Sequence, residues 1–242
     1  MCGRFFRNTP REEIAAAFHA RWTGDEDPLG YNIAPSQLIL AVRLDTKHNE
    51  RLLSPLHWGL IPHFAKDRQI AWRLINARAE TVDKQSSYRD AFTLHRCIVP
   101  LDGFFEWKTM GKVKQPYAFA LESRKPMGIA GLWSNWKDPA SGEWVRSCTL
   151  ITTQANEVVR AIHDRMPVVL EPADYARWLG EESASPGELK AMLRPFDASP
   201  MVSWPVSRAI NKPGGDDDAS VLARVDVRSR GEREDDGGPE RV

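Results

Sequence analysis

The sequence contains few cysteines, no long apolar run and no net charge, and each absence excludes a class of protein. Its three cysteines, Cys2, Cys97 and Cys148, are too few and odd in number for a disulfide framework. They also lack the close spacing of metal ligands, so we expect no metal and no cofactor. No run of about eighteen apolar residues is present, which excludes a membrane-spanning helix. Because the N-terminus lacks the apolar stretch of a secretory signal, we expect a soluble, cytoplasmic protein.

The charges cancel over the whole chain, but they are unevenly distributed. Residues 1–211 contain 27 basic and 24 acidic residues, a mildly basic balance that is too weak for general nucleic-acid binding. Residues 228–242 are rich in Gly, Arg and acidic residues and contain almost nothing apolar, so we predict that they are disordered. The chain therefore divides into one domain, residues 1–227, and a charged tail, residues 228–242.

The secondary-structure signals favour many short strands and a few helices. A capping box from Thr9 to Glu12, with Pro10 at the first helical position, predicts a helix that runs to Phe18. The stretch 185–188 repeats this signal. Because the strands do not alternate strictly with helices, we predict an α+β fold, a single domain on a largely antiparallel, barrel-like sheet with peripheral helices. The predicted strands are 38–44, 56–59, 97–100, 117–121, 127–133, 148–152 and 202–206.

Cys2 is unusual because of its position. Methionine aminopeptidases remove Met1 before a small second residue, which leaves a free amine and a thiol on Cys2. These groups have reference pKa values of roughly 8 and about 8.5, so both are partly nucleophilic near neutral pH. A 1,2-aminothiol condenses with an aldehyde to form a thiazolidine. The alternatives are an N-terminal nucleophile for amide hydrolysis and a cysteine at this position by chance.

Three further residues are candidates for acid–base or substrate-binding roles. Glu106 is flanked by aromatic residues; an inward-facing carboxylate there would act as a general acid or base, whereas an outward-facing one would be a solvated strand residue. His163 follows a candidate helix. It can serve as a proton-transfer group, or it can cap the helix. Asn76 can offer its amide to a sugar, or can belong to a polar turn with Arg78.

Aromatic residues provide a second signal, since the chain contains nine tryptophans. Trp58 and Phe64 bracket the turn Gly-Leu-Ile-Pro-His, where exposed rings would stack on the bases of single-stranded nucleic acid. The alternative is that most of these rings belong to the core. We assign Cys97 and Cys148, in apolar strands, to an inert core.

Eight stretches of the chain, in order, resemble the SOS response-associated peptidase (SRAP) family of abasic-site processing proteins. The resemblance extends from residue 2 to about residue 211 and covers nearly all of the predicted domain. The matching stretches are MCGRF (1–5), YNIAP (31–35), HWGLIP (57–62), INARAET (75–81), RCIVPLDGFFEW (96–107), AGLW (130–133), IHDRMPV (162–168) and PVS (205–207).

This resemblance implies covalent capture of abasic sites in single-stranded DNA. It implies that Cys2, after removal of Met1, forms a thiazolidine with the ring-opened sugar aldehyde. It also implies roles for other residues within the matching stretches. The implied companions of Cys2 are Asn76, Glu106 and His163, and the implied phosphate contacts are Arg4, Arg78 and Arg165.

The chain departs from the family pattern in two places, and two other functions stay open. Similar proteins often carry Trp where this chain has His63-Phe64, and a basic residue shortly before Tyr88, for which Arg89 is the candidate substitute. One alternative function is a cysteine peptidase that uses Cys2, with autoproteolytic removal of Met1 as its narrowest form. The other is a non-enzymatic module for single-stranded DNA. We expect a monomer, associated with the nucleoid in a bacterium.

Overall fold

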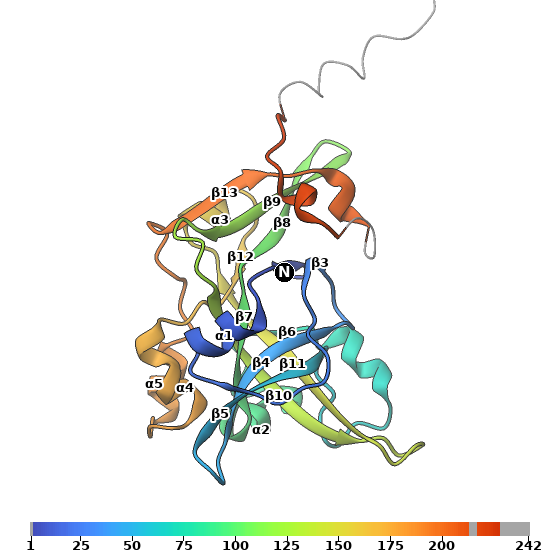
Figure 1. Cartoon of the computed structure of the whole chain (residues 1–242), viewed down its shortest axis with the longest axis vertical. Coiled ribbons are helices and arrows are strands. Elements are labelled where there is room, and N and C mark those ends of the chain that lie inside the picture. Colours follow the sequence, from blue (N-terminus) through green and yellow to red (C-terminus); the bar gives the residue numbers. More distant parts are fainter. Residues whose placement is uncertain (1, 213–216, 228–242) are drawn as a thin grey trace, which may run out of the picture.

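Many strands and a few short helices follow one another along residues 2–212 and 217–227, which the computed structural model describes (Figure 1). The strands are β1 (Phe5–Arg7), β2 (Arg21–Trp22), β3 (Gly30–Ile33), β4 (Leu38–Asp45), β5 (Glu50–Trp58), β6 (Asn76–Arg78), β7 (Arg96–Leu101), β8 (Gly103–Met110), β9 (Val113–Leu121), β10 (Met127–Lys137), β11 (Trp144–Gln154), β12 (Arg165–Pro167) and β13 (Met201–Pro205). The α-helices are α1 (Arg11–Ala17), α2 (Ser86–Leu94), α3 (Glu157–Arg160), α4 (Tyr175–Leu179) and α5 (Pro186–Ala191). The 3-10 helices are η1 (Arg68–Arg73), η2 (Pro172–Asp174), η3 (Arg208–Asn211) and η4 (Ala219–Leu222).

Five strands close into a barrel in the order β4, β5, β11, β10 and β7. Most neighbours are antiparallel, but β5 pairs with β11 in parallel, with Trp58 opposite Cys148. This single parallel pairing closes the sheet and makes the barrel mixed. Closure leaves the five strands without a free edge between them, which protects them from pairing with other chains.

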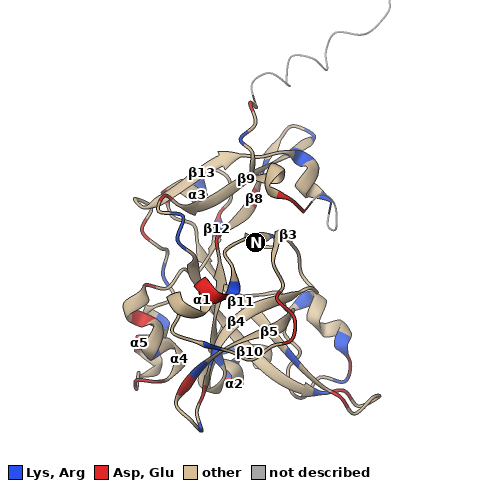
Figure 2. Cartoon of the chain, viewed as in Figure 1, with Lys and Arg blue, Asp and Glu red and all other residues tan. Residues whose placement is uncertain are grey.

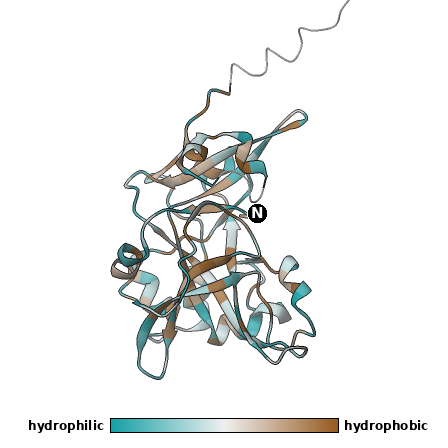
Figure 3. Ribbon diagram, turned by 45° about the vertical axis from the view of Figure 1, so that its right-hand side comes forward, coloured by the Kyte–Doolittle hydropathy of each residue, from teal (hydrophilic) through white to brown (hydrophobic). Residues whose placement is uncertain are grey.

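Alternating apolar residues fill the barrel and cover its outer face. On β4, Ile39 and Ala41 belong to the inner cluster, which also contains Cys97 and Cys148. Leu40 and Val42, which alternate with them along β4, belong to a second cluster with residues of α1, α2, α4 and α5. Figure 3 shows these apolar strands at the centre of the molecule. Burial of each large apolar side chain stabilises the fold by about 1.5–3 kcal/mol.

A second sheet, in the order β13, β9, β8, β1 and β3, carries the N-terminus over one end of the barrel (Figure 1). Asp102 links β7 of the barrel to β8 of this sheet and is buried. Its carboxylate accepts hydrogen bonds from the backbone N–H groups of Asn8 and Thr9, at 2.6 and 2.7 Å, and from the Thr9 hydroxyl at 2.6 Å. These bonds hold the segment after β1 beside the β7–β8 connection.

The predicted α+β class, single domain and barrel-like sheet are confirmed, and each predicted strand is present with somewhat different bounds. The capping box at 185–188 is confirmed by reciprocal bonds between Ser185 and Glu188. The capping box at Thr9 is wrong, because the Thr9 hydroxyl donates to Asp102 and α1 begins at Arg11 without a side-chain cap. The predicted tail, 228–242, lies outside the described residues.

Among residues 2–212 and 217–227, no helix combines the length and the apolar character that crossing a membrane requires. Figure 2 shows basic and acidic residues interspersed over both sheets.

Candidate active site

The side chains that the sequence analysis singled out for catalysis meet at the end of the barrel beneath the second sheet. The Asn76 side-chain amide donates a hydrogen bond to the Cys2 carbonyl oxygen over 2.7 Å. Nε2 of His163 lies 3.9 Å from Oε2 of Glu106. Cys2 and Glu106 are buried, at 0% and 2% exposure, so both lie in the protein interior. The structure thus brings together a sulfur nucleophile, a carboxylate, an imidazole and an amide.

Strand pairing explains why residues distant in sequence converge here. β1 pairs with β8, with Phe5 opposite Phe104, so Cys2 lies near the β8 residue Glu106. β6 lies parallel to β11, with Asn76 opposite Leu150. β12 pairs antiparallel with the last three residues of β11, Thr152–Gln154. His163 lies two residues before β12, and β11 therefore positions both the amide and the imidazole.

Burial dominates the electrostatics of Cys2 and Glu106. Burial raises the pKa of the Cys2 thiol, and the nearby charge of Glu106 raises it further. Burial also raises the pKa of the Glu106 carboxyl, while His163 partly offsets that increase. A carboxyl whose pKa is raised toward neutrality can both accept and return a proton. The outward-facing alternative for Glu106 is therefore wrong.

The backbone fixes how His163 presents its ring. The N–H of Arg165 donates to Nδ1 of His163 over 3.0 Å. A neutral imidazole that accepts at Nδ1 carries its proton on Nε2, the nitrogen nearer Glu106. Asp164, whose side chain is exposed, lies 3.1 Å from Nδ1. His163 is therefore oriented for proton transfer on the side of Glu106 and Cys2.

Three arginines with proposed phosphate contacts lie at or near the surface. The guanidinium of Arg165 forms a two-point ion pair with the Glu80 carboxylate, at 2.5 and 3.1 Å. Arg78 ends β6 and is exposed. Arg89 lies on α2 with an exposed side chain and a contact of 3.3 Å to Asp90.

Arg4 and Trp58 differ from the other predicted binding residues because both are buried, at 7% and 1% exposure. Arg4 donates to the Asn32 side chain and to the Ile210 carbonyl, each at 2.6 Å. The expected exposure of Trp58 is wrong, because its indole N–H donates to the Ile75 carbonyl over 2.9 Å. Arg4 thus connects the segment before β1 to β3 and η3. Trp58 holds Ile75, the residue before Asn76, which contacts Cys2.

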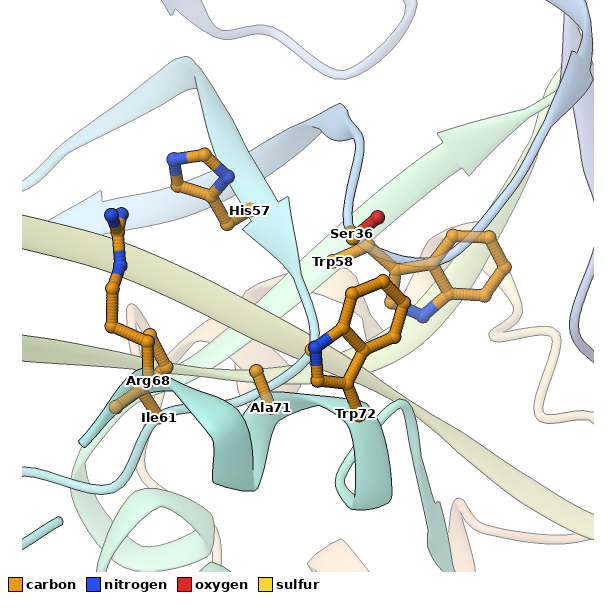
Figure 4. Close-up of a pocket in the computed structure, with 8 residues that line it drawn as sticks. Ser36, His57, Trp58, Ile61, Arg68, Ala71 and Trp72 are labelled. Atoms are coloured by element: carbon orange, nitrogen blue, oxygen red, sulfur yellow. The ribbon is translucent and has the colours of Figure 1, made fainter. Parts of the chain in front are cut away.

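A surface hollow of about 270 Å³ borders Trp58 (Figure 4). Trp72, which the sequence analysis missed, is 65% exposed at its edge, and Phe64 is 53% exposed in the loop just before η1. Figure 4 shows Arg68 on the same side of the hollow as His57. Burial, followed by the charge of Arg68, lowers the pKa of His57. The lining residues are Ser36, His57, Trp58, Gly59, Ile61, Arg68, Ala71 and Trp72.

The described part of the chain contains no cluster of three or more His, Cys, Asp or Glu side chains with the arrangement of a metal site. The side chains around Cys2 are of the types that perform nucleophilic and proton-transfer chemistry.

Comparison with known proteins identifies relatives over most of the chain. A family profile described as SOS response associated peptidase (SRAP) matches residues 1–213. The abasic site processing protein YoqW of Bacillus subtilis is 40% identical over 217 residues, which cover 88% of this chain and 95% of that protein. The abasic site processing protein YedK of Escherichia coli is 30% identical over 216 residues, which cover 87% of this chain and 94% of that protein.

The fold also has solved counterparts. A crystal structure of a protein from Bacteroides thetaiotaomicron superposes with a TM-score of 0.83 at 25% identity, and the match covers 93% of this chain and 100% of that chain. A crystal structure of a protein from Bordetella bronchiseptica gives a TM-score of 0.73 at 27% identity and covers 85% of this chain.

Proposed function

Because the chain belongs to the SOS response associated peptidase (SRAP) family, we propose that it responds to DNA damage by capturing abasic sites in single-stranded DNA through a covalent bond to Cys2. Its relatives YoqW and YedK are abasic site processing proteins. The observation that carries the proposal is the convergence of Cys2 with Asn76, Glu106 and His163. An aldehyde is the reactive group of an opened abasic sugar, and an aminothiol is a specific partner for it.

The proposal requires that Met1 be removed, because the amine that reacts is the α-amine of Cys2. Met1 itself lies outside the described residues. The free amine attacks the sugar aldehyde carbon to give a carbinolamine, which loses water to form an imine. The Cys2 sulfur then bonds to the imine carbon while its proton passes to the nitrogen. The product is a thiazolidine, and one water molecule is the only other product.

The neighbouring side chains supply the protons that these steps need. His163 opens the closed sugar by moving a proton to the ring oxygen. Glu106 takes a proton from the amine and returns it to the departing hydroxyl, a transfer typically worth about a hundred- to ten-thousand-fold in rate. Asn76 holds the Cys2 carbonyl with its amide nitrogen. Its Oδ1 is buried without a hydrogen-bond partner among the described residues, which leaves it available to a sugar hydroxyl.

DNA would be held by phosphate contacts and by base stacking. Arg78, Arg89 and Arg165 are the proposed phosphate contacts, and Phe64 and Trp72 are the exposed rings that can stack on bases. Such binding depends strongly on salt and little on sequence. Local arginines therefore suffice for binding despite the balanced charge of the chain.

The test is a denaturing gel of purified protein mixed with a labelled single strand that contains one abasic site. The wild-type protein should give a shifted band that Cys2→Ala abolishes. Cys2→Ser keeps the amine, so it should give a shifted band only after borohydride reduction. Without the thiol, the imine persists and β-elimination should cleave more of the strand. Absence of a shift with protein that has lost Met1 would refute covalent capture.

The peptidase activity of the proposal is limited to the chain's own Met1. If the active site removes Met1, the Glu106→Gln variant should retain it, and intact mass spectrometry should show the added mass. Loss of Met1 from both proteins would instead assign its removal to a methionine aminopeptidase. Salt-sensitive binding to intact DNA, with no covalent product from either protein, would favour a simple binding module.

A further inference from the structure

We propose that Glu80 is an internal substitute for a DNA phosphate, which occupies the guanidinium of Arg165 in the free protein and is displaced when DNA binds. This inference rests on the proposed function, because it assigns Arg165 to a backbone phosphate. It identifies Glu80 as a residue that lowers the affinity for intact DNA. Retention on DNA then depends on the covalent bond that only an abasic site can form.

The geometry of the Glu80–Arg165 pair is that of phosphate recognition. Nη1 of Arg165 lies 2.5 Å from Oε1 of Glu80, and Nη2 lies 3.1 Å from Oε2. Two parallel N–H donors that face two anionic oxygens form the arrangement by which arginine also binds phosphate. A carboxylate and a phosphate therefore compete for the same face of the guanidinium.

Arg165 would stay in place when Glu80 leaves. Its Nη2 also donates to the Thr152 carbonyl over 2.6 Å. Its backbone belongs to β12, where it pairs with Gln154 of β11. Its backbone N–H donates to Nδ1 of His163, which ties the main chain of Arg165 to the catalytic cluster. Displacement of Glu80 thus exposes a cation that is already positioned.

The main chain of Glu80 is also fixed, so only its side chain has to move. Nζ of Lys190 donates to the Ala79 carbonyl over 2.6 Å and to the Glu80 carbonyl over 3.4 Å, and it pairs with Asp83 at 2.7 Å. The Glu80 side chain is 45% exposed, whereas that of Arg165 is 14% exposed. A rotation of the Glu80 side chain into solvent would free Arg165 without rearranging a strand.

The surrounding charges keep Glu80 ionised. Hydrogen bonding to Arg165 lowers the pKa of the Glu80 carboxyl, and the charges of Arg165 and Arg78 lower it further. Glu80 therefore neutralises the guanidinium of Arg165 at neutral pH, and its charge also acts on Arg78, a second proposed phosphate contact. Because the Glu80 side chain is 45% exposed to water, the pair contributes little net free energy, so a polyanion that releases counterions can replace it.

The experiment compares Glu80→Gln with Glu50→Gln in binding to an intact, fluorescent single strand. Glu50 is a matched control because it pairs with Arg21 in the same two-point manner, at 2.7 and 3.0 Å, in the β4–β5 hairpin and β2. Both substitutions change the net charge equally. Glu80→Gln should tighten binding by about 2- to 10-fold at low salt and steepen the salt dependence by about 0.7, the value for one phosphate. Glu50→Gln should change neither.

Two further variants make the test specific to the pair. Glu80→Asp keeps the charge but is too short to reach both nitrogens, so it should give a smaller gain. In an Arg165→Gln background, Glu80→Gln should lose most of its effect. Unchanged or weaker binding by Glu80→Gln, an equal gain from Glu50→Gln, or a gain that persists without Arg165 would overturn the inference.

The abasic-site gel separates this result from the proposed function. If the wild-type protein forms the covalent product but Glu80→Gln binds intact DNA no more tightly, only the inference about Glu80 fails. If no covalent product forms while Glu80→Gln binds more tightly, the capture mechanism fails and the inference about Glu80 stands.

Discussion

The side-chain nitrogen of Asn76 lies 2.7 Å from the Cys2 carbonyl oxygen and donates a hydrogen bond to it. The bond joins β6, which is paired along the barrel strand β11, to the segment before β1. The main-chain carbonyl oxygen of Asn76 accepts a hydrogen bond from the Tyr88 hydroxyl over 3.0 Å. Asn76 thus connects the barrel to Cys2 and restricts the position of this reactive residue.

Asn76→Ala should slow crosslink formation by about 5- to 10-fold, the loss of one net hydrogen bond of about 1 kcal/mol. The loss should appear in the time course on the denaturing gel, with little change in melting temperature. Tyr88→Phe is the control, since it removes the other hydrogen bond but leaves the Asn76 amide on Cys2. An unchanged rate for Asn76→Ala would show that this contact does not position Cys2.

The raised pKa of the Glu106 carboxyl predicts how the crosslinking rate depends on pH. Burial raises the pKa of this carboxyl, so its ionised, proton-accepting form is lost as pH falls through that raised value. The crosslinking rate should fall over the same range. Glu106→Gln protein that has lost Met1 should be slower by about a hundredfold or more and should lack this dependence. Rates measured between pH 4 and 8 check this; the same acid limb in both proteins would assign it to another group.

The same shift makes a prediction about stability. A carboxyl whose pKa is higher in the folded state than in the unfolded state binds more protons when folded, so it destabilises the fold at high pH. This cost disappears as pH falls through the raised pKa. Glu106→Gln should therefore raise the melting temperature at pH 8 and have less effect at pH 4. A melting temperature that falls at both pH values would make Glu106 a structural residue.

Local sequence predicted those features that depend on neighbours in the chain. Aromatic flanks marked Glu106 as a candidate acid or base, and apolar flanks placed Cys97 and Cys148 in the core, where both are fully buried. These flanks did not decide whether the Glu106 carboxylate points inward or outward. That depends on β1, which pairs with β8 and places Cys2 beside it.

Features that depend on distant partners were not predictable in this way. Thr9 has the sequence of a helix cap, but the buried Asp102 takes its hydroxyl and its N–H. Trp58 lies at a turn, but it packs against Phe5, with ring centroids 5.1 Å apart. The parallel pairing of β11 with β5 and β6, which closes the barrel and places Asn76, joins segments that no local pattern relates.

Trp72 had a weak sequence signal, since it lies between the basic residues Arg68 and Arg73. Trp72→Ala should weaken binding of intact single-stranded DNA by about 1–3 kcal/mol, the range for one stacked base. Trp144→Ala is a matched control, because Trp144 is 64% exposed and Trp72 is 65% exposed. Fluorescence anisotropy should separate the two variants, while melting temperatures should stay similar. Equal losses of affinity would argue against a specific stacking platform.

β1 and β8 approach each other closely at Gly103, where a side chain would collide with its neighbours. A Cβ at Gly103 would lie 2.2 Å from Cζ of Phe6 and 2.5 Å from the Phe119 carbonyl oxygen, and the latter cannot move without shifting β9. Gly103→Ala should therefore lower the free energy of unfolding by about 3 kcal/mol. Crosslinking should fall as well, because β1 carries Cys2 toward Glu106.

Gly111, in the turn between β8 and β9, provides the control for this substitution. It has φ of 58°, and a Cβ there would have no neighbour within 4 Å. Gly111→Ala should cost only about 1 kcal/mol, from the left-handed backbone alone. Urea unfolding curves measure both variants. Equal costs would show that the close contact between β1 and β8 is not the constraint that holds the reactive residue in place.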